Sequence, residues 1–240
     1  MKRLPLLLLM LAGGIFLAIQ TMGSGNSTPP SKYERILQSI HVILTQGHYQ
    51  PKAINDDFSK KVFNKFLSDL DGEKNILLQE DIKALKKYET KIDEEIKGQP
   101  VEFFLEAGKI FNRRIDDASK IYKEILSKPF DFTIDETFQA ERKNAQFPVT
   151  TAEQKELWRK KLKYLTLDRF VELQNIRERS KGDSGFVAKT DVELEKEARQ
   201  KVLQAMDRTF DRYKYKFNDD DKFNLFVNAI TTTMDPYTEF

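Results

Sequence analysis

The apolar residues of the chain recur mostly at steps of three and four, a spacing that predicts amphipathic helices. The clearest of these predicted helices begins at Asn55-Asp56 and ends at Asp71-Gly72. The same spacing predicts seven helices, at about residues 31–47, 55–70, 79–97, 101–127, 150–177, 190–213 and 219–234. The inward positions of the second helix are Phe58, Val62, Phe63, Phe66, Leu67 and Leu70.

Helix starts and inward faces follow from the same pattern. Ser31, Thr150 and Thr190 each stand three residues before a Glu, as in a capping box. In the first helix the predicted inward residues are Ile36, Ile40, Ile43 and Leu44. In the third helix the inward residues are Ile82, Leu85, Ile92 and Ile96. In the sixth helix they recur at steps of three and four between Leu194 and Tyr213. In the last helix they are Phe223, Phe226, Val227 and Ile230. The long fifth helix has Leu157, Trp158, Leu162, Leu165, Phe170, Leu173 and Ile176 inward.

Residues 130–149 break the helical pattern. Phe130 to Ile134 alternates with a period of two, which is typical of a short strand or an extended crossing. No fixed-period repeat is present, so a solenoid is not favoured. The predicted fold is an all-α, irregular multi-helix domain over residues 31–240, with possible lobes at 31–128 and 150–240 hinged near 129–150.

The N-terminal segment has the pattern of a signal for export. Lys2 and Arg3 precede an apolar run from Leu4 to Ile19, and a small, polar stretch follows, which is the order of a secretory signal. The run is shorter than the roughly 20 residues of a spanning helix, although it could serve as an uncleaved anchor. We therefore expect residues 1–25 to be a signal peptide or N-terminal anchor, and the remainder to lie in the periplasm or cell envelope.

Composition narrows the classes of function. The chain has 40 Lys+Arg and 38 Asp+Glu, and cleavage near Gly25 would leave 38 of each. A general nucleic-acid binder usually carries an excess of basic residues, so this balance of charges argues against that class. Because there is no Cys, a disulfide scaffold, a thiol nucleophile and thiolate metal sites are excluded. Basic clusters such as Arg159-Lys160-Lys161 and Lys86-Lys87 read as solvated helix faces.

Candidate chemistry is sparse. Gly182-Asp183-Ser184-Gly185 looks like the segment around the nucleophile of trypsin-like serine proteases, with His41 upstream. Such a site needs Ser, His and Asp to converge on a rigid frame with an oxyanion hole, whereas this Ser lies in a loop between two predicted helices. We therefore interpret residues 181–189 as a mobile helix–helix loop.

Metal sites are also disfavoured. A calcium loop with Gly72 at its sixth position would need acids at Leu67 and Leu78, so Asp69-Leu70-Asp71-Gly72 is read as a helix end. Asp219-Asp220-Asp221 is read as the capped start of a helix. His41 and His48 lack zinc-ligand spacing. We predict no catalytic, cofactor-binding or metal-ligating residue and no cofactor.

Two stretches of the sequence contain motifs that are more specific than the pattern of an amphipathic helix. The first runs from His48-Tyr49-Gln50-Pro51 through Leu70-Asp71 to Asn75-Ile76-Leu77-Leu78, and the second from Asp219 to Met234-Asp235-Pro236-Tyr237-Thr238. Together, over about residues 33 to 240, they resemble the N-terminal region of the tail-specific proteases, the carboxy-terminal processing peptidases of the bacterial envelope. One departure is Tyr237, where that family often has His, which leaves the role of this position in linking to the core open.

The resemblance implies a fold and a function. In that family a secreted helical domain precedes a PDZ domain and a serine-protease core with a Ser–Lys dyad, which cleaves substrates near apolar C-termini. The helical domain helps to shape the chamber and can dock adaptor proteins. Because the sequence ends at Phe240, the PDZ domain and core are expected outside it, and no catalytic residue is carried over. The implied partners are that core, an envelope adaptor and protein substrates.

Two alternatives stay open at this point. One is a stand-alone helical interaction module of the envelope without proteolytic activity. The other is an unrelated helical protein that binds lipid or peptide in a groove between helices. If a downstream core normally covers the last helix, Phe223, Phe226 or Tyr237 are expected to be partly exposed.

Overall fold

A computed structural model describes residues 31–142, 144–182 and 184–237, and the expected signal segment lies outside these residues. Within them the protein is helical and has no strand, which confirms the all-α prediction. The α-helices are α2 (Lys32–Val42), α3 (Asp56–Leu70), α4 (Gln79–Leu85), α5 (Ile92–Ile96), α6 (Phe103–Leu126), α7 (Thr151–Arg179), α8 (Asp191–Tyr215) and α9 (Asp219–Met234). Shorter turns of other helix types lie at Ile43–Gly47, Lys86–Tyr88 and Ser180–Gly182.

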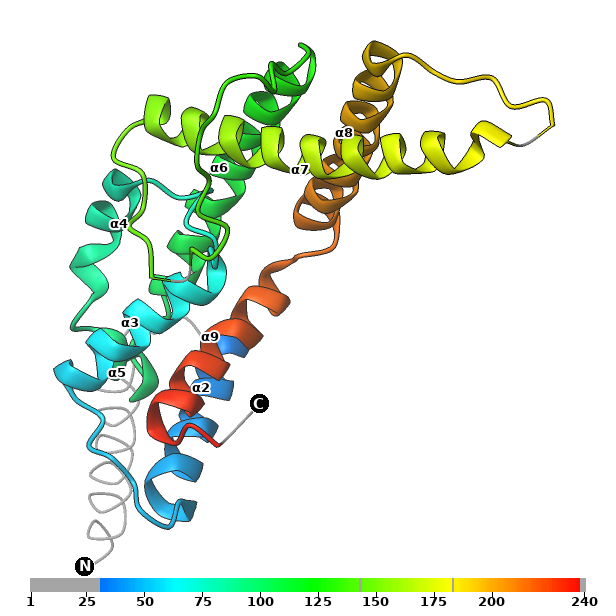
Figure 1. The fold of residues 1–240 in the computed structure, drawn as a ribbon. Coiled ribbons are helices and arrows are strands. Elements are labelled where there is room, and N and C mark those ends of the chain that lie inside the picture. Colours follow the sequence, from blue (N-terminus) through cyan, green and yellow to red (C-terminus); the bar gives the residue numbers. More distant parts are fainter. Residues whose placement is uncertain (1–30, 143, 183, 238–240) are drawn as a thin grey trace, which may run out of the picture.

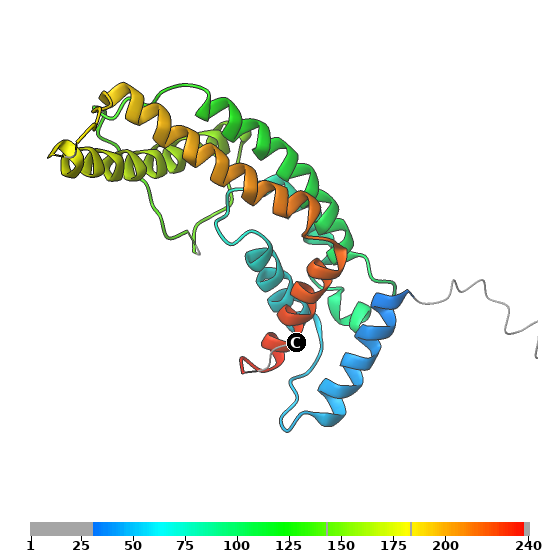
Figure 2. The same cartoon turned by 90° about the vertical axis from the view of Figure 1, so that its right-hand side faces the viewer.

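The helices form an elongated molecule with α6 along its length (Figure 1). The helices α7 and α8 pack against each other at one end, where they cross at a large angle, and α2, α3, α5 and α9 gather at the other end. Turning the molecule shows α8 lying beside α6 and α2 at the outer edge (Figure 2). The chain therefore returns, through α8 and α9, to pack against its own first helices.

One main core joins the helices from both halves of the sequence. It includes Phe66 of α3, Phe103 of α6 and Phe226 of α9, whose rings pack against one another at centroid distances of 5.3 to 5.8 Å. Aromatic pairs in such edge-on geometry add to the free energy of area burial. A division of the chain into lobes at 31–128 and 150–240 stays a prediction.

The predicted third helix is wrong as a single element. It is divided into α4, a turn at Lys86–Tyr88 and α5, because α4 packs against α6 whereas α5 packs against α2 and α3. The new start at α5 is satisfied by a distant side chain, since Asp93 donates its backbone N–H to Ser59 Oγ of α3 at 2.8 Å. Local spacing carries no sign of this cap.

The predicted inward face of the first helix is partly wrong. Leu37, Ile40 and Leu44 are buried, whereas Ile36 and Ile43 are exposed. The buried residues follow steps of three and four from Leu37, and the wider turn at Ile43–Gly47 then changes the helix type. In α7 the predicted inward residue Ile176 is likewise exposed, while Trp158 and Leu162 are buried.

Residues 130–142 and 144–149 cross the molecule and contain no strand (Figure 1). Phe132 stacks on Phe170 of α7 at 5.5 Å between ring centroids, and Gln79 donates its backbone N–H to Pro148 O at 2.9 Å. The crossing is therefore attached at both ends. In the part of the chain that the structure describes, no helix is both long enough and apolar enough to span a membrane.

Candidate functional site

The residues that carried the sequence resemblance gather in two places. One is the end of α9, which meets the segment after α2, and the other is the turn between α3 and α4. We call the first the C-terminal clasp, defined by His48, Lys52, Thr233, Met234 and Asp235. We call the second the motif loop, defined by residues 71–78.

The C-terminal clasp ties the end of α9 to residues that are more than 180 positions earlier. Lys52 Nζ donates to Thr233 O at 2.8 Å, and the backbone N–H of Lys52 points at Met234 Sδ at 3.0 Å. His48 Nε2 lies 3.4 Å from Asp235 Oδ2, and both side chains are half-buried. Since α9 ends at Met234 and Asp235 is extended, the clasp fixes the direction in which the backbone leaves the helix.

A second link holds the other end of α9. Asp220 accepts hydrogen bonds from Lys32 and from the Tyr33 hydroxyl of α2, the latter at 2.9 Å. Asp221 accepts from the backbone N–H of Asn218 at 2.9 Å, which confirms the predicted capped start. These contacts hold the start of α9 against α2, and the clasp holds its end against the segment after α2.

The motif loop is organised by one buried carboxylate. Asp71 is 3% exposed and accepts three backbone hydrogen bonds, from Asn75, Ile76 and Leu77, at 2.8 to 3.1 Å. Burial raises the pKa of Asp71, and the three N–H donors oppose that rise. Because both carboxylate oxygens accept backbone N–H groups, the carboxylate organises the turn.

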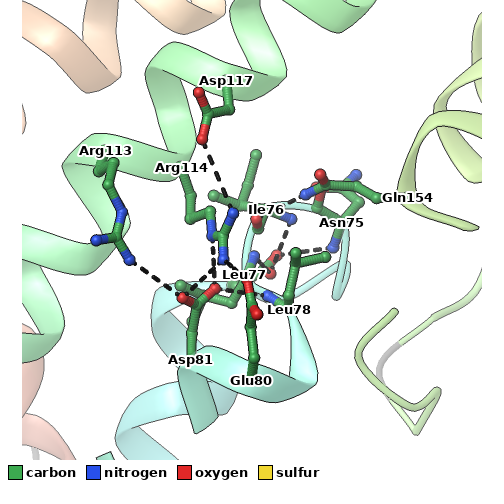
Figure 3. Close-up of polar contacts among 11 residues, drawn as sticks. Asn75, Ile76, Leu77, Leu78, Glu80, Asp81, Arg113, Arg114, Asp117 and Gln154 are labelled. Atoms are coloured by element: carbon green, nitrogen blue, oxygen red, sulfur yellow. Dashed lines mark hydrogen bonds and ion pairs between the residues drawn. The ribbon is translucent and has the colours of Figure 1, made fainter. Parts of the chain in front are cut away.

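Neighbouring helices complete the polar cluster around this loop (Figure 3). Asp81 accepts from the Leu78 backbone N–H at 2.9 Å and from Arg114 Nε of α6 at 2.7 Å. Gln154 of α7 donates to Ile76 O at 2.7 Å, and Trp158 Nε1 donates to Asn75 O at 2.9 Å. The loop therefore joins α3, α4, α6 and α7.

Glu95 of α5 is a third buried acid, and its side chain lies beside the start of α6. Glu95 Oε1 accepts from the backbone N–H groups of Glu102 and Phe103 at 3.1 and 3.0 Å. Its other oxygen is buried and has no hydrogen-bond partner within the described residues. Burial is the main reason that the pKa of Glu95 rises to about 7, and the two N–H donors limit the rise.

The candidates from the sequence do not assemble into an active site. Ser184 is exposed in the loop between α7 and α8, at the opposite end of the molecule from α2, which carries His41 (Figure 1). His41 is half-buried in its helix, and His48 follows that helix at a turn. Over residues 31–142, 144–182 and 184–237, no group of three or more His, Asp or Glu side chains is placed to hold a metal ion.

Several residues that position these clusters were not predicted from the sequence. Lys52 has no local signal, since its partners are 181 and 182 residues away. The interpretation of Arg159 and Lys161 as a solvated face holds only in part, because both side chains are half-buried; Arg159 pairs with Glu136 and Lys161 with Glu73. Hydrogen bonds from Arg159 and then Lys163 lower the pKa of Glu136 to about 2.

The fold and these clusters define an all-α domain in which buried carboxylates fix helix ends, while exposed and half-buried polar groups tie α9 to α2 and to the segment after it. The family described as "Tail specific protease N-terminal domain" matches residues 40–240, and the chain belongs to this family. The chain is also similar to the tail-specific protease of Haemophilus influenzae, with 25% identity over 198 residues, covering 82% of this chain and 26% of the relative. It thus spans about a quarter of that relative's length.

The range that matches the family, residues 40–240, includes the residue clusters described above. It contains both sides of the C-terminal clasp and the whole motif loop, and it leaves out residues 31–39 at the start of α2. The resemblance inferred from the sequence is thereby confirmed. The chain is the N-terminal domain of a tail-specific protease.

Proposed function

We propose that this domain acts without catalysis of its own, as a scaffold that positions the protease core and as a platform for an adaptor and for protein substrates. The observation that carries the proposal is the family match over residues 40–240, which spans the whole C-terminal clasp. The clasp holds the end of α9 against the segment after α2, so a folded core that followed it would start from a fixed point.

The scaffold role has a direct test in the native organism. An immunoblot with serum raised against this chain should detect a protein several times longer than 240 residues. A native product of 240 residues or fewer would contradict the scaffold role and favour a stand-alone interaction module. The serum should lose its signal in a strain that lacks the gene.

Export to the periplasm is part of the same proposal. It rests on the basic, apolar and polar order of the first 30 residues. Cell fractionation should recover the protein in the periplasmic or membrane fraction, and N-terminal sequencing should read a start near residue 25 if the signal is cleaved. Recovery in the cytoplasm with Met1 intact would contradict export.

The platform role predicts partners from the cell envelope. Crosslinking in cells followed by mass spectrometry should recover an envelope protein together with the full-length protease. A matched control is the protease without residues 31–237, with its signal segment kept. Recovery of the same envelope proteins with this control would place the contact outside the helical domain.

A further inference from the structure

Four large apolar side chains are exposed around the C-terminal clasp. Tyr49 is 100% exposed, Tyr237 95%, Ile43 63% and Val42 49%. We call these four residues the clasp patch. Exposed apolar side chains that gather at one place mark a contact surface more often than single exposed ones do.

The clasp itself draws these residues toward one another. Tyr49 is the chain neighbour of His48, and Tyr237 follows Asp235 by two residues and donates its backbone N–H to Asp235 Oδ1 at 3.0 Å. Since His48 Nε2 lies 3.4 Å from Asp235 Oδ2, the two tyrosines flank one contact. Val42 and Ile43 stand at the end of α2, at the turn that leads into His48.

The patch lies on the outer side of the molecule. The buried side of α2, with Leu37, Ile40 and Leu44, packs into the main core, and α2 itself is at the edge of the fold (Figure 2). The expectation of an exposed last helix is wrong for Phe223 and Phe226, which are 3% and 0% exposed, whereas Tyr237 is bare. At this end of the molecule the exposed apolar side chains therefore lie beside the end of α9 and not on it, while other exposed apolar residues, such as Leu167 and Val171, lie on α7.

The position of the patch indicates its occupant. The chain spans 26% of the tail-specific protease that it resembles, and its last described residue, Tyr237, belongs to the patch. A folded segment that continued from this point would meet the patch at almost no cost in chain entropy, because a very short connection is the least costly to close. Neither partner would need to find the other by diffusion.

We propose that the clasp patch is the docking surface for the folded segment that follows the helical domain in the full-length protease. This inference rests on the proposed function, because it requires that segment. The occupant lies in the same polypeptide, so docking would hold the core in a fixed orientation to the helical domain. The contact is apolar, and it includes Ile43 and Tyr49, which are the two positions probed below.

Because this chain contains no Cys, a single introduced Cys can be labelled specifically to measure the accessibility of one position. Ile43→Cys and Tyr49→Cys are made singly, both in the 240-residue chain and in the full-length protease, and Val192→Cys serves as a matched control. Val192 is 79% exposed in the first turn of α8, on the hairpin at the other end of the molecule. The rate of maleimide labelling at each site is followed by mass spectrometry of the peptide that contains it, and circular dichroism checks that each variant stays helical.

The expected result is labelling at least ten-fold slower at Cys-substituted positions 43 and 49 in the full-length protease than in the 240-residue chain, with equal rates at position 192. Equal rates at 43 and 49 in a full-length protein that hydrolyses peptides would overturn the docking surface and leave the proposed function standing. Slowing at position 192 to the same extent would also overturn it, because the cover would then not be specific to the patch.

Two further outcomes concern a different occupant and a missing core. Labelling at 43 and 49 that slows in the 240-residue chain as its concentration rises would assign the patch to a second copy of this chain and overturn the proposal. A reading frame that stops at residue 240 would overturn both the docking surface and the scaffold role. Peptide hydrolysis by the full-length protein therefore reports on the function, and labelling reports on the surface.

Discussion

At the residue scale, the buried carboxylates carry information that the hydrophobic pattern lacks. Asp71 and Glu95 both lie below the surface and both accept backbone N–H groups. From the sequence, Asp71 was predicted only as part of a helix end, and no role was predicted for Glu95. Their partners lie four to eight residues away in irregular turns, where no periodic rule applies. Lys74 reaches its place through a left-handed φ of 53°, which is uncommon for a residue other than glycine.

Glu95 gives a prediction of pH-dependent stability. Burial raises its pKa from 4.5 to about 7, so the folded state binds a proton that the unfolded state releases between those values. The stabilising contribution of neutral Glu95 is complete below about pH 4.5 and is lost as the pH rises through 7. The loss is at most about 3 kcal/mol.

Glu95→Gln should therefore remove this part of the pH dependence. The amide oxygen can still accept from Glu102 and Phe103, and the side chain no longer ionises. Urea unfolding at pH 5 and pH 8 is the measurement, with Glu94→Gln, an exposed neighbour, as the control. A wild-type and a Glu95→Gln protein that lose equal stability between the two pH values would show that Glu95 does not titrate in this range.

At the scale of elements, the sequence predicted those helices whose apolar spacing and local end signals persist along their whole length. The ranges of α3, α6, α8 and α9 follow from periodicity and local caps such as Asn55 and Thr190. The third predicted helix failed because its two halves pack on different helices and its second half is capped by Ser59. The arrangement of Lys52 against Thr233 could not be predicted either, since it depends on how distant helices return to each other.

The motif loop should be sensitive to its central acid. Asp71→Ala would leave three buried backbone N–H groups without their acceptor, which we expect to cost about 3 kcal/mol. Asp69→Ala removes an exposed ion pair with Lys65 and should cost less than about 1 kcal/mol. Urea unfolding compares the two. Similar losses for both variants would mean that the Asp71 contacts do not stabilise the loop.

The hairpin of α7 and α8 should open independently of the rest at its distal end. Leu173, Leu194 and Ala198 form a small cluster separate from the main core. Leu194→Ala should raise hydrogen exchange mainly in residues 170–200, because the lost contacts are confined to that cluster. Leu162→Ala, in the main core, should instead raise exchange throughout the domain. A uniform rise for Leu194→Ala would show that the hairpin unfolds only together with the core.

At the scale of the whole molecule, the family could be predicted from the order of short motifs along the sequence, and several residues of these motifs meet at two structural junctions. His48 and Asp235 meet in the C-terminal clasp, while Asp71 and Asn75 meet in the motif loop. The burial of Phe223 and Phe226 could not be predicted, since it depends on α2 and α6 packing over α9. The clasp is thus the link between the fold and the proposed scaffold role.

The most direct test of that role is peptide hydrolysis by the 240-residue chain and by the full-length protein under the same conditions. The substrate is a peptide with an apolar C-terminus, and circular dichroism confirms that the shorter chain is folded. We expect cleavage by the full-length protein and none by the 240-residue chain. Cleavage by the purified 240-residue chain, abolished by a serine-directed inhibitor, would contradict the noncatalytic role.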